Sequence, residues 1–195
     1  MPNRSSGEKT KIILAESLRR LMKKKPLDKI KIREIVEECG LNRQTFYYHF
    51  QDIYALLEWM YQYDGEQIIR NNFKSGDIFA VSKAMIAYIE SHREELISVI
   101  ESKAEVYFLD FLYNGVAQCF DIIIGKKTAN LSVSAEYRKF IVSVYTNGVV
   151  GIVREWIIAP DSNRLTCEQL LEMFEIASKG TIKLTINNYL KSIEE

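Results

Sequence analysis

The side chains best suited to chemistry lie together in one short run, Arg-Gln-Thr-Phe-Tyr-Tyr-His, at residues 43–49. On a helix, Phe46 and Phe50 share one face and pack inward, which leaves the polar side chains on the other faces. Such side chains bind base edges and phosphate oxygens, so their chemistry is recognition rather than bond making. A polar helix face most often simply meets water. Two adjacent tyrosines and a histidine are harder to explain that way, because at most two of them can share the inward face.

The rest of the chain offers little to a catalyst. The only histidines are His49 and His92, and neither has a cysteine or carboxylate beside it at a metal-binding spacing. The sequence contains no glycine-rich phosphate loop and no Gly-x-Ser-x-Gly elbow. We therefore expect a protein that is not an enzyme and that uses no metal or cofactor.

The compartment is indicated by cysteines and by hydrophobic segments. Cys39, Cys119 and Cys167 are odd in number and far apart, which is typical of reduced thiols in the cytosol. The first eleven residues lack the apolar segment of a signal peptide. No uncharged apolar stretch approaches the roughly 18 residues that cross a bilayer. The sequence predicts a cytoplasmic protein without membrane contact.

Charge is distributed unevenly along a chain whose formal net charge is zero. Residues 1–50 contain 12 Lys and Arg against 6 Asp and Glu, whereas residues 51–195 contain 14 against 20. A solvated charge run is the common explanation of such a bias. A basic N-terminal part on an acidic remainder is also the pattern expected for a polyanion partner.

The elements that would position residues 43–49 are helices. Apolar spacing predicts a helix over 9–24 and a short one over Ile32–Glu38, which Gly40 ends in the left-handed conformation. Asn42 is placed to cap the next helix. In such a helix-turn-helix the second helix enters the major groove, where Arg43 would address guanine and Gln44 adenine. A helical adaptor that never touches nucleic acid remains the alternative.

Helical spacing continues to the end of the chain, and no alternating strand pattern occurs. We expect a turn at 75–77 and an all-α fold, with a three-helix DNA-binding domain at 1–50 and a helical dimerisation and regulatory body at 51–195. The helices expected in the body cover residues 52–72, 78–91, 93–100, 106–124, 134–159 and 166–193.

The run from Ile32 to Phe50, ending Thr-Phe-Tyr-Tyr-His-Phe, resembles the DNA-binding signature of the TetR family of bacterial regulators. The resemblance implies groove-reading roles for Arg43, Gln44 and Thr45, with Lys9 or Lys11 on the DNA backbone. Phosphate contacts are implied for Tyr47 and His49. The DNA-binding residues expected are therefore Lys31, Arg33, Asn42, Arg43, Gln44, Thr45, Tyr47, Tyr48 and His49.

Two departures from the family pattern weaken the expected contacts with phosphate. Lys31 stands where many members have a Thr or Ser, and residues 51–54 lack the lysine that often begins the next helix. Each lost contact lowers affinity and flattens its dependence on salt. We expect modest DNA binding by the protein alone.

The body is similar to a narrower branch, the Firmicutes regulators of dihydroxyacetone kinase operons, over Asn-Gly-Val-Val-Gly-Ile-Val-Arg-Glu-Trp-Ile at residues 147–157. This resemblance implies an activator of such an operon, acting with a dihydroxyacetone-binding co-activator related to a kinase subunit. The alternative is a TetR-type repressor released by a small ligand bound in its own body. The aromatic residues over 88–120 fit an ordinary core better than such a ligand site.

Small residues on the helix expected at 134–159 allow another helix to approach closely, although packing within the chain explains them equally well. The family resemblance implies a homodimer in which the last two long helices pair with their copies. The dimerisation residues expected on these helices are Val144, Gly148, Gly151, Ile152, Trp156, Phe174 and Ile182.

Overall fold

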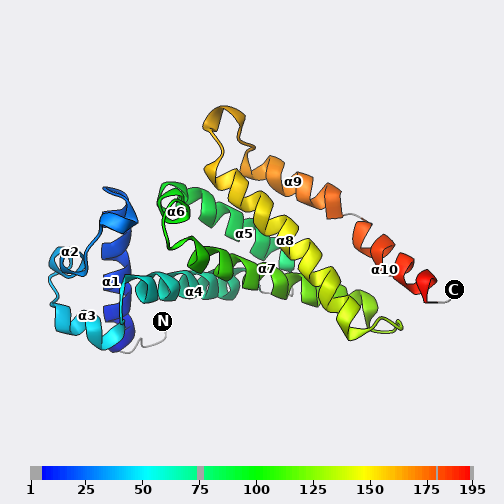
Figure 1. The fold of residues 1–195 in the computed structure, drawn as a ribbon, viewed down its shortest axis with the longest axis horizontal. Helices are drawn as coiled ribbons and strands as arrows, with labels where there is room; N and C mark the ends of the chain where they lie inside the picture. The colour runs from blue at the N-terminus through cyan, green and yellow to red at the C-terminus, as the bar shows by residue number, and fades with distance from the viewer. Residues whose placement is uncertain (1–5, 74–76, 179, 194–195) are drawn as a thin grey trace. The chain divides into compact units, whose positions relative to one another are not determined.

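The computed structural model describes residues 6–73, 77–178 and 180–193, and these residues contain helices and no strand (Figure 1). The all-α prediction is therefore confirmed. Of the turn predicted at 75–77, only Asp77 lies within the described residues. The elements are α1 Ser6–Met22, η1 Leu27–Lys29, α2 Ile32–Glu38, α3 Arg43–His49, α4 Ile53–Asn72, α5 Ile78–Ser91, α6 Arg93–Ile100, α7 Glu105–Thr128, α8 Ala135–Ile158, η2 Asp161–Asn163, α9 Cys167–Ser178 and α10 Thr181–Ser192.

The helices group into two compact units. Unit 1 comprises the described residues up to Asp77 together with Ser91–Phe111, and unit 2 comprises Ile78–Glu90 and the residues from Leu112 onward. Helices α4 and α6 belong to unit 1 because both pack against α1. Division by packing therefore differs from the functional boundary expected at residue 50, which stays a prediction.

The core of unit 1 is built from apolar faces of α1 to α4 and α6. Phe46 of α3 is fully buried, as is Tyr61 of α4, whose ring packs edge-on against that of Phe108 at 5.3 Å between centroids. Each fully buried apolar side chain stabilises the fold by about 1.5–3 kcal/mol. Other fully buried side chains of this core are Leu14, Leu18, Ile35, Leu56, Leu57 and Leu96.

The turn between α2 and α3 follows directly from its sequence. Gly40 has a φ of 70°, and its amide donates to the Glu37 carbonyl while the Leu41 amide donates to that of Val36 at 2.8 Å. This pair of bonds ends a helix where glycine enters the left-handed conformation at low cost. Asn42 then caps α3, because its Oδ1 accepts from the Thr45 amide at 2.8 Å. Both predicted signals are confirmed.

Unit 2 has its own buried cluster, which joins α7, α8 and α10. Ile124, Ile141, Ile182 and Ile186 are its buried members. Partly buried aromatic rings pack around it, including Tyr137, whose own ring stacks on that of Tyr189 with the centroids 3.9 Å apart.

Two helix ends differ from the sequence prediction. Helix α7 continues through Gly125 to Thr128, because burial of Ile124 and a hydrogen bond from Thr128 Oγ1 to its carbonyl outweigh the weak helix propensity of glycine. The single helix expected over 166–193 is two helices. Gly180, with a φ of 84°, stands between α9 and α10 in a conformation that interrupts a right-handed helix.

Helices α7 and α8 are long and apolar enough to cross a membrane by length and composition alone, in contrast to the expectation that no such segment occurs. Core helices of soluble proteins pass the same test. Only a minority of either apolar segment is buried within the chain. Several large apolar side chains on these helices are exposed, among them Ile122 on α7 and Phe140 and Val144 on α8.

Candidate nucleic-acid interface

Helix α3 buries one face and exposes the other. Phe46 is fully buried, whereas Arg43 and Gln44 are exposed and the rings of Tyr47 and Tyr48 are 58% and 83% exposed. Helices α1 and α2 pack against each other, and both contact α3, so two helices support the buried face of α3. The exposed residues Arg43, Gln44, Tyr47 and Tyr48 form what we call the α3 face, which combines a cation, an amide and two phenols on a rigid support.

Thr45 plays a different part from its neighbours. Its Oγ1 donates to Asn42 Oδ1 at 3.1 Å, the same oxygen that accepts from the Thr45 amide. The Thr45 hydroxyl is thus engaged in the helix cap. Of the three residues expected to read bases, Arg43 and Gln44 are exposed, while Thr45 is half-buried and positions the first turn.

The end of α3 meets the beginning of α1. Burial lowers the pKa of His49, and the charge of Lys11 lowers it further. The Lys11 ammonium lies 5.6 Å from the ring centroids of both Phe50 and Trp59, within the range of cation–π attraction. Neutral His49 can still donate one hydrogen bond, and Lys11 supplies a cation held in place by two rings. Trp59 was missed by sequence reasoning, since nothing local connects it to Lys11.

The two cations expected on α2 differ in availability. Arg33 pairs with Glu37 at 2.5 Å, and this hydrogen bond raises the Arg33 pKa. Lys31 has an exposed side chain, while its amide donates to Glu34 Oε2 at 3.0 Å. That bond satisfies one amide at the start of α2, although a lysine side chain cannot accept the reciprocal bond of a capping box. The four-residue spacing of Arg33 and Glu37 is the signal that would have revealed their pairing.

All nine predicted DNA-binding residues lie in or next to α2 and α3 of unit 1. Their assignment to DNA stays a prediction, since no nucleic acid is present. What the arrangement offers chemically is a set of donors for base edges on the first turn of α3 and donors for phosphate at its far end.

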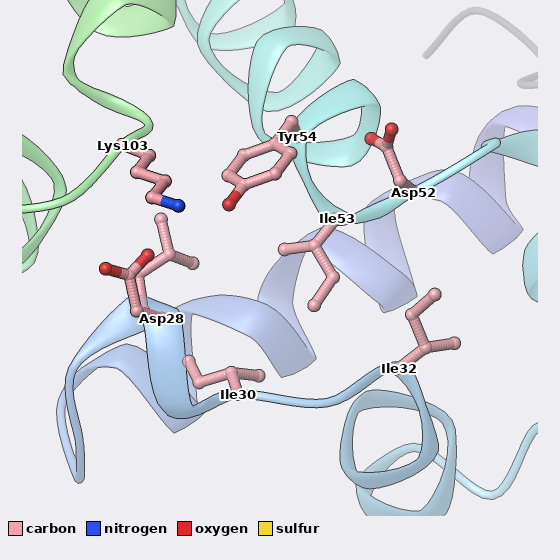
Figure 2. Close-up of a pocket in the computed structure, with 8 residues that line it drawn as sticks. Asp28, Ile30, Ile32, Asp52, Ile53, Tyr54 and Lys103 are labelled. Atoms are coloured by element: carbon pink, nitrogen blue, oxygen red, sulfur yellow. The ribbon is translucent and has the colours of Figure 1, made fainter.

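A hollow of about 410 Å³ lies elsewhere in unit 1. Figure 2 shows the side chains of Asp28, Tyr54 and Lys103 approaching one another there, with isoleucines along the wall. The ring of Tyr54 also stacks on that of Tyr107, 5.5 Å away between centroids. Asp28 and Asp52 place two carboxylates in this lining, which disfavours a phosphate backbone. The hollow therefore does not extend the α3 face.

The dimerisation residues predicted on α8 separate into exposed and buried ones. Val144 and Ile152 are 52% and 47% exposed, and Gly148 and Gly151 are exposed as well. Apart from the adjacent backbone of α8 itself, no atom of the described residues lies within 4 Å of a Cβ built on either glycine. We call Val144, Gly148, Gly151 and Ile152 the α8 face, which offers a surface that a second helix could approach closely. Other exposed apolar side chains on the following helices are Met173, Ile176 and Leu184.

Trp156 and Ile182 do not belong to this surface, because each is buried within unit 2. Trp156 Nε1 donates to the Leu165 carbonyl at 2.7 Å, and the Arg164 guanidinium lies 4.9 Å from its ring centroid. Ile182 is part of the buried isoleucine cluster. Phe174 is half-buried. Helical spacing alone could not distinguish an inward from an outward apolar residue here.

Comparison with known families matches two regions that together cover most of the chain. Residues 14–60 match the family described as bacterial regulatory proteins of the TetR family, and residues 77–180 match a transcriptional regulator C-terminal region of TetR type. The first match covers α2 and α3 and the second covers α5 to α9.

Individual relatives agree with these families. The DhaS protein of Lactococcus lactis, an HTH-type transcriptional activator of the dhaKLM operon, is 24% identical over 169 residues, which are 84% of this chain and 88% of that protein. A solved structure of the dihydroxyacetone kinase operon activator DhaS has a TM-score of 0.65 at 20% identity, covering 93% of this chain and 96% of that one. A Pseudomonas aeruginosa PAO1 protein classed among transcriptional regulators has a TM-score of 0.56 at 13% identity, over 92% and 93%.

Proposed function

This chain belongs to the TetR family of bacterial transcriptional regulators, and from that premise we propose that it activates a dihydroxyacetone kinase operon together with a dihydroxyacetone-sensing co-activator. The observation that carries the proposal is the similarity to DhaS, which spans both the DNA-binding and the C-terminal region. The operon, the direction of regulation and the co-activator are all inferred from that similarity. Family members are transcription regulators and not enzymes.

Recognition of the operator rests on the α3 face. Helix α3 enters the major groove with its first turn nearest the bases, so Arg43 faces guanine N7 and O6 and Gln44 faces an adenine edge. Tyr47, Tyr48 and His49, with Lys11 and Lys31, bind phosphates and set the register of α3 on the duplex. Arg33 adds less, because its charge is already paired with Glu37.

The active species is a cytoplasmic homodimer. TetR-family proteins bind DNA as dimers, and two recognition helices about 34 Å apart meet successive major grooves on one side of the duplex. The exposed apolar residues of the α8 face support helix pairing between copies, since burying them removes apolar area from water. Pairing of this kind also covers apolar surface on α8 that would otherwise resemble a membrane segment.

The test is binding to the promoter region of a neighbouring dihydroxyacetone kinase operon, measured with and without the co-activator and dihydroxyacetone. An Arg43→Ala/Tyr47→Ala variant is expected to lose specific binding, whereas Arg70→Ala, which removes an exposed charge away from α3, is expected to retain it. Modest binding that strengthens with the co-activator supports activation. Equally tight binding without any partner supports the alternative, a repressor that senses its own ligand. Absence of binding in every combination contradicts the operon assignment.

A further inference from the structure

A buried carboxylate links three helices of unit 1 outside the DNA-contacting surface. Glu95 of α6 is 2% exposed, and its Oε2 accepts from Arg19 Nη1 of α1 at 3.1 Å. The other terminal nitrogen of Arg19 donates to Asp64 Oδ2 of α4. Arg19 and Asp64 are themselves mostly buried. One guanidinium therefore holds together α1, α4 and α6.

The charges of this cluster do not balance when all three groups are ionised. Two carboxylates share one guanidinium, and Glu95 Oε1 is buried with no hydrogen-bond partner among the described residues. Burial raises the pKa of Glu95 from its ordinary 4.5 to about 7. The positive charges of Arg19 and Lys23 oppose that rise, and the negative charge of Asp64 adds to it.

We propose that Arg19, Asp64 and Glu95 form a proton-linked cluster, which we call the joint. In this cluster, protonation of Glu95 stabilises the packing of α1 against α6. A neutral Glu95 leaves Arg19 and Asp64 as a balanced pair and removes an unbalanced charge from a poorly solvated site. Helix α1 is the element that this joint would steady, and it packs on both α2 and α3 and carries Lys11. The joint thus acts on DNA recognition from a position that never contacts DNA.

The sign of the effect follows from proton linkage. Because the folded state holds the Glu95 proton at pH values where the unfolded chain has lost it, stability is greatest below pH 4.5 as far as this group is concerned. The contribution of Glu95 to the free energy of unfolding then decreases as the pH rises towards 7, and it is lost above pH 7. Raising the pH from 6 to 8 should increase the unfolding equilibrium constant roughly tenfold through Glu95 alone.

The test compares wild type with Glu95→Gln, which resembles the protonated side chain. Urea unfolding is measured at pH 6 and pH 8. Between these two pH values the unfolding equilibrium constant of wild type is expected to rise by roughly tenfold more than that of the variant. An identical pH effect in both proteins overturns the proposal. Carboxyl ¹³C NMR of wild type gives a reading that needs no variant: a Glu95 midpoint near 4.5 overturns the proposal, and one near neutrality supports it. Asp64→Asn is expected to lower the midpoint, since it removes the neighbouring negative charge.

The effect on DNA rests on the proposed function and is measured separately. Operator affinity of wild type is expected to weaken between pH 6 and pH 8 by more than that of Glu95→Gln, while His49 titrates in both proteins. If both proteins lose affinity equally, the joint does not act on recognition. If neither binds DNA but the unfolding data differ as expected, the joint is supported and the proposed function fails.

Discussion

The α3 face and the α8 face are both exposed, yet they differ in what would cover them. The α3 face consists of donors on a helix that unit 1 already supports from behind. The α8 face consists of apolar side chains and glycines whose missing Cβ atoms leave open space. A surface of donors can stay in water until it meets a polyanion, whereas an apolar surface gains by being covered at all times. Exposure alone therefore does not define a binding site, and the chemistry of the exposed atoms indicates the partner.

The largest expected effect comes from breaking the support behind the α3 face. Phe46→Ala removes a fully buried ring and is expected to lower the free energy of unfolding by about 3–5 kcal/mol. Urea unfolding followed by circular dichroism measures the change. Tyr48→Ala on the same helix should alter stability by no more than about 0.5 kcal/mol. Similar losses in both variants would contradict the division of α3 into a packed and an open face.

The next effect concerns the α8 face. Gly151→Leu replaces a poor helix former at a position where the described residues outside the local helix backbone leave space for a Cβ, so the folding of each chain should not suffer. Close approach of a second copy should be blocked at a cost of about 1–3 kcal/mol, which weakens the dimer roughly ten- to hundredfold. Sedimentation over a range of concentrations measures this, with Gly151→Ala as the graded control. An unchanged dimer would place the interface elsewhere.

A comparable or smaller effect is expected from one side chain of the α3 face. Arg43→Ala should cost about 1–3 kcal/mol in operator binding and relax the base preference at one position. Arg70→Ala makes the control, because it removes an exposed charge on α4 away from α3. Fluorescence anisotropy on the operator and on single-base variants distinguishes the two. Equal losses on all sequences would assign Arg43 to phosphate instead of a base.

The smallest effect concerns the pH dependence of the α3 face. Burial and Lys11 lower the pKa of His49, so His49 is neutral at pH 7 and should protonate only below its ordinary 6.5. The stability that His49 contributes is therefore present above that value and falls as pH decreases through it. In NMR spectra the ring resonances of His49 should titrate with a midpoint below pH 6.5, and this midpoint should rise in Lys11→Ala. An unchanged His49 midpoint in Lys11→Ala would contradict an electrostatic effect of Lys11 on His49.

Local signals in the sequence predicted the α3 region well, and they failed where contacts are distant. The bounds of α2, the left-handed Gly40 and the Asn42 cap depend on neighbouring residues. Helical spacing predicts Trp156 on the dimer surface, yet its ring is buried against Arg164 and Leu165, which lie beyond the end of α8.

Separation in the sequence also explains why the contact between Arg19 and Glu95 was not predicted. Arg19 and Glu95 are separated by 76 positions, so no periodicity connects them. Gly125 and Gly180 show the reverse problem. Both glycines are poor helix formers by propensity, yet α7 continues past Gly125, next to the buried Ile124, whereas Gly180 with its φ of 84° separates α9 from α10.

The position of α10, which follows all of unit 1 in the sequence, has a consequence for the order in which a new chain acquires structure on the ribosome. Helix α10 carries Ile182 and Ile186, two of the four isoleucines that complete the buried cluster of unit 2. Both emerge after every residue of unit 1, and folding during synthesis proceeds from the N-terminal side. Each nascent chain would thus assemble its operator-reading half while the half that pairs with another copy still lacks part of its core. Assembly into dimers would then begin only between chains whose recognition helices are already in place.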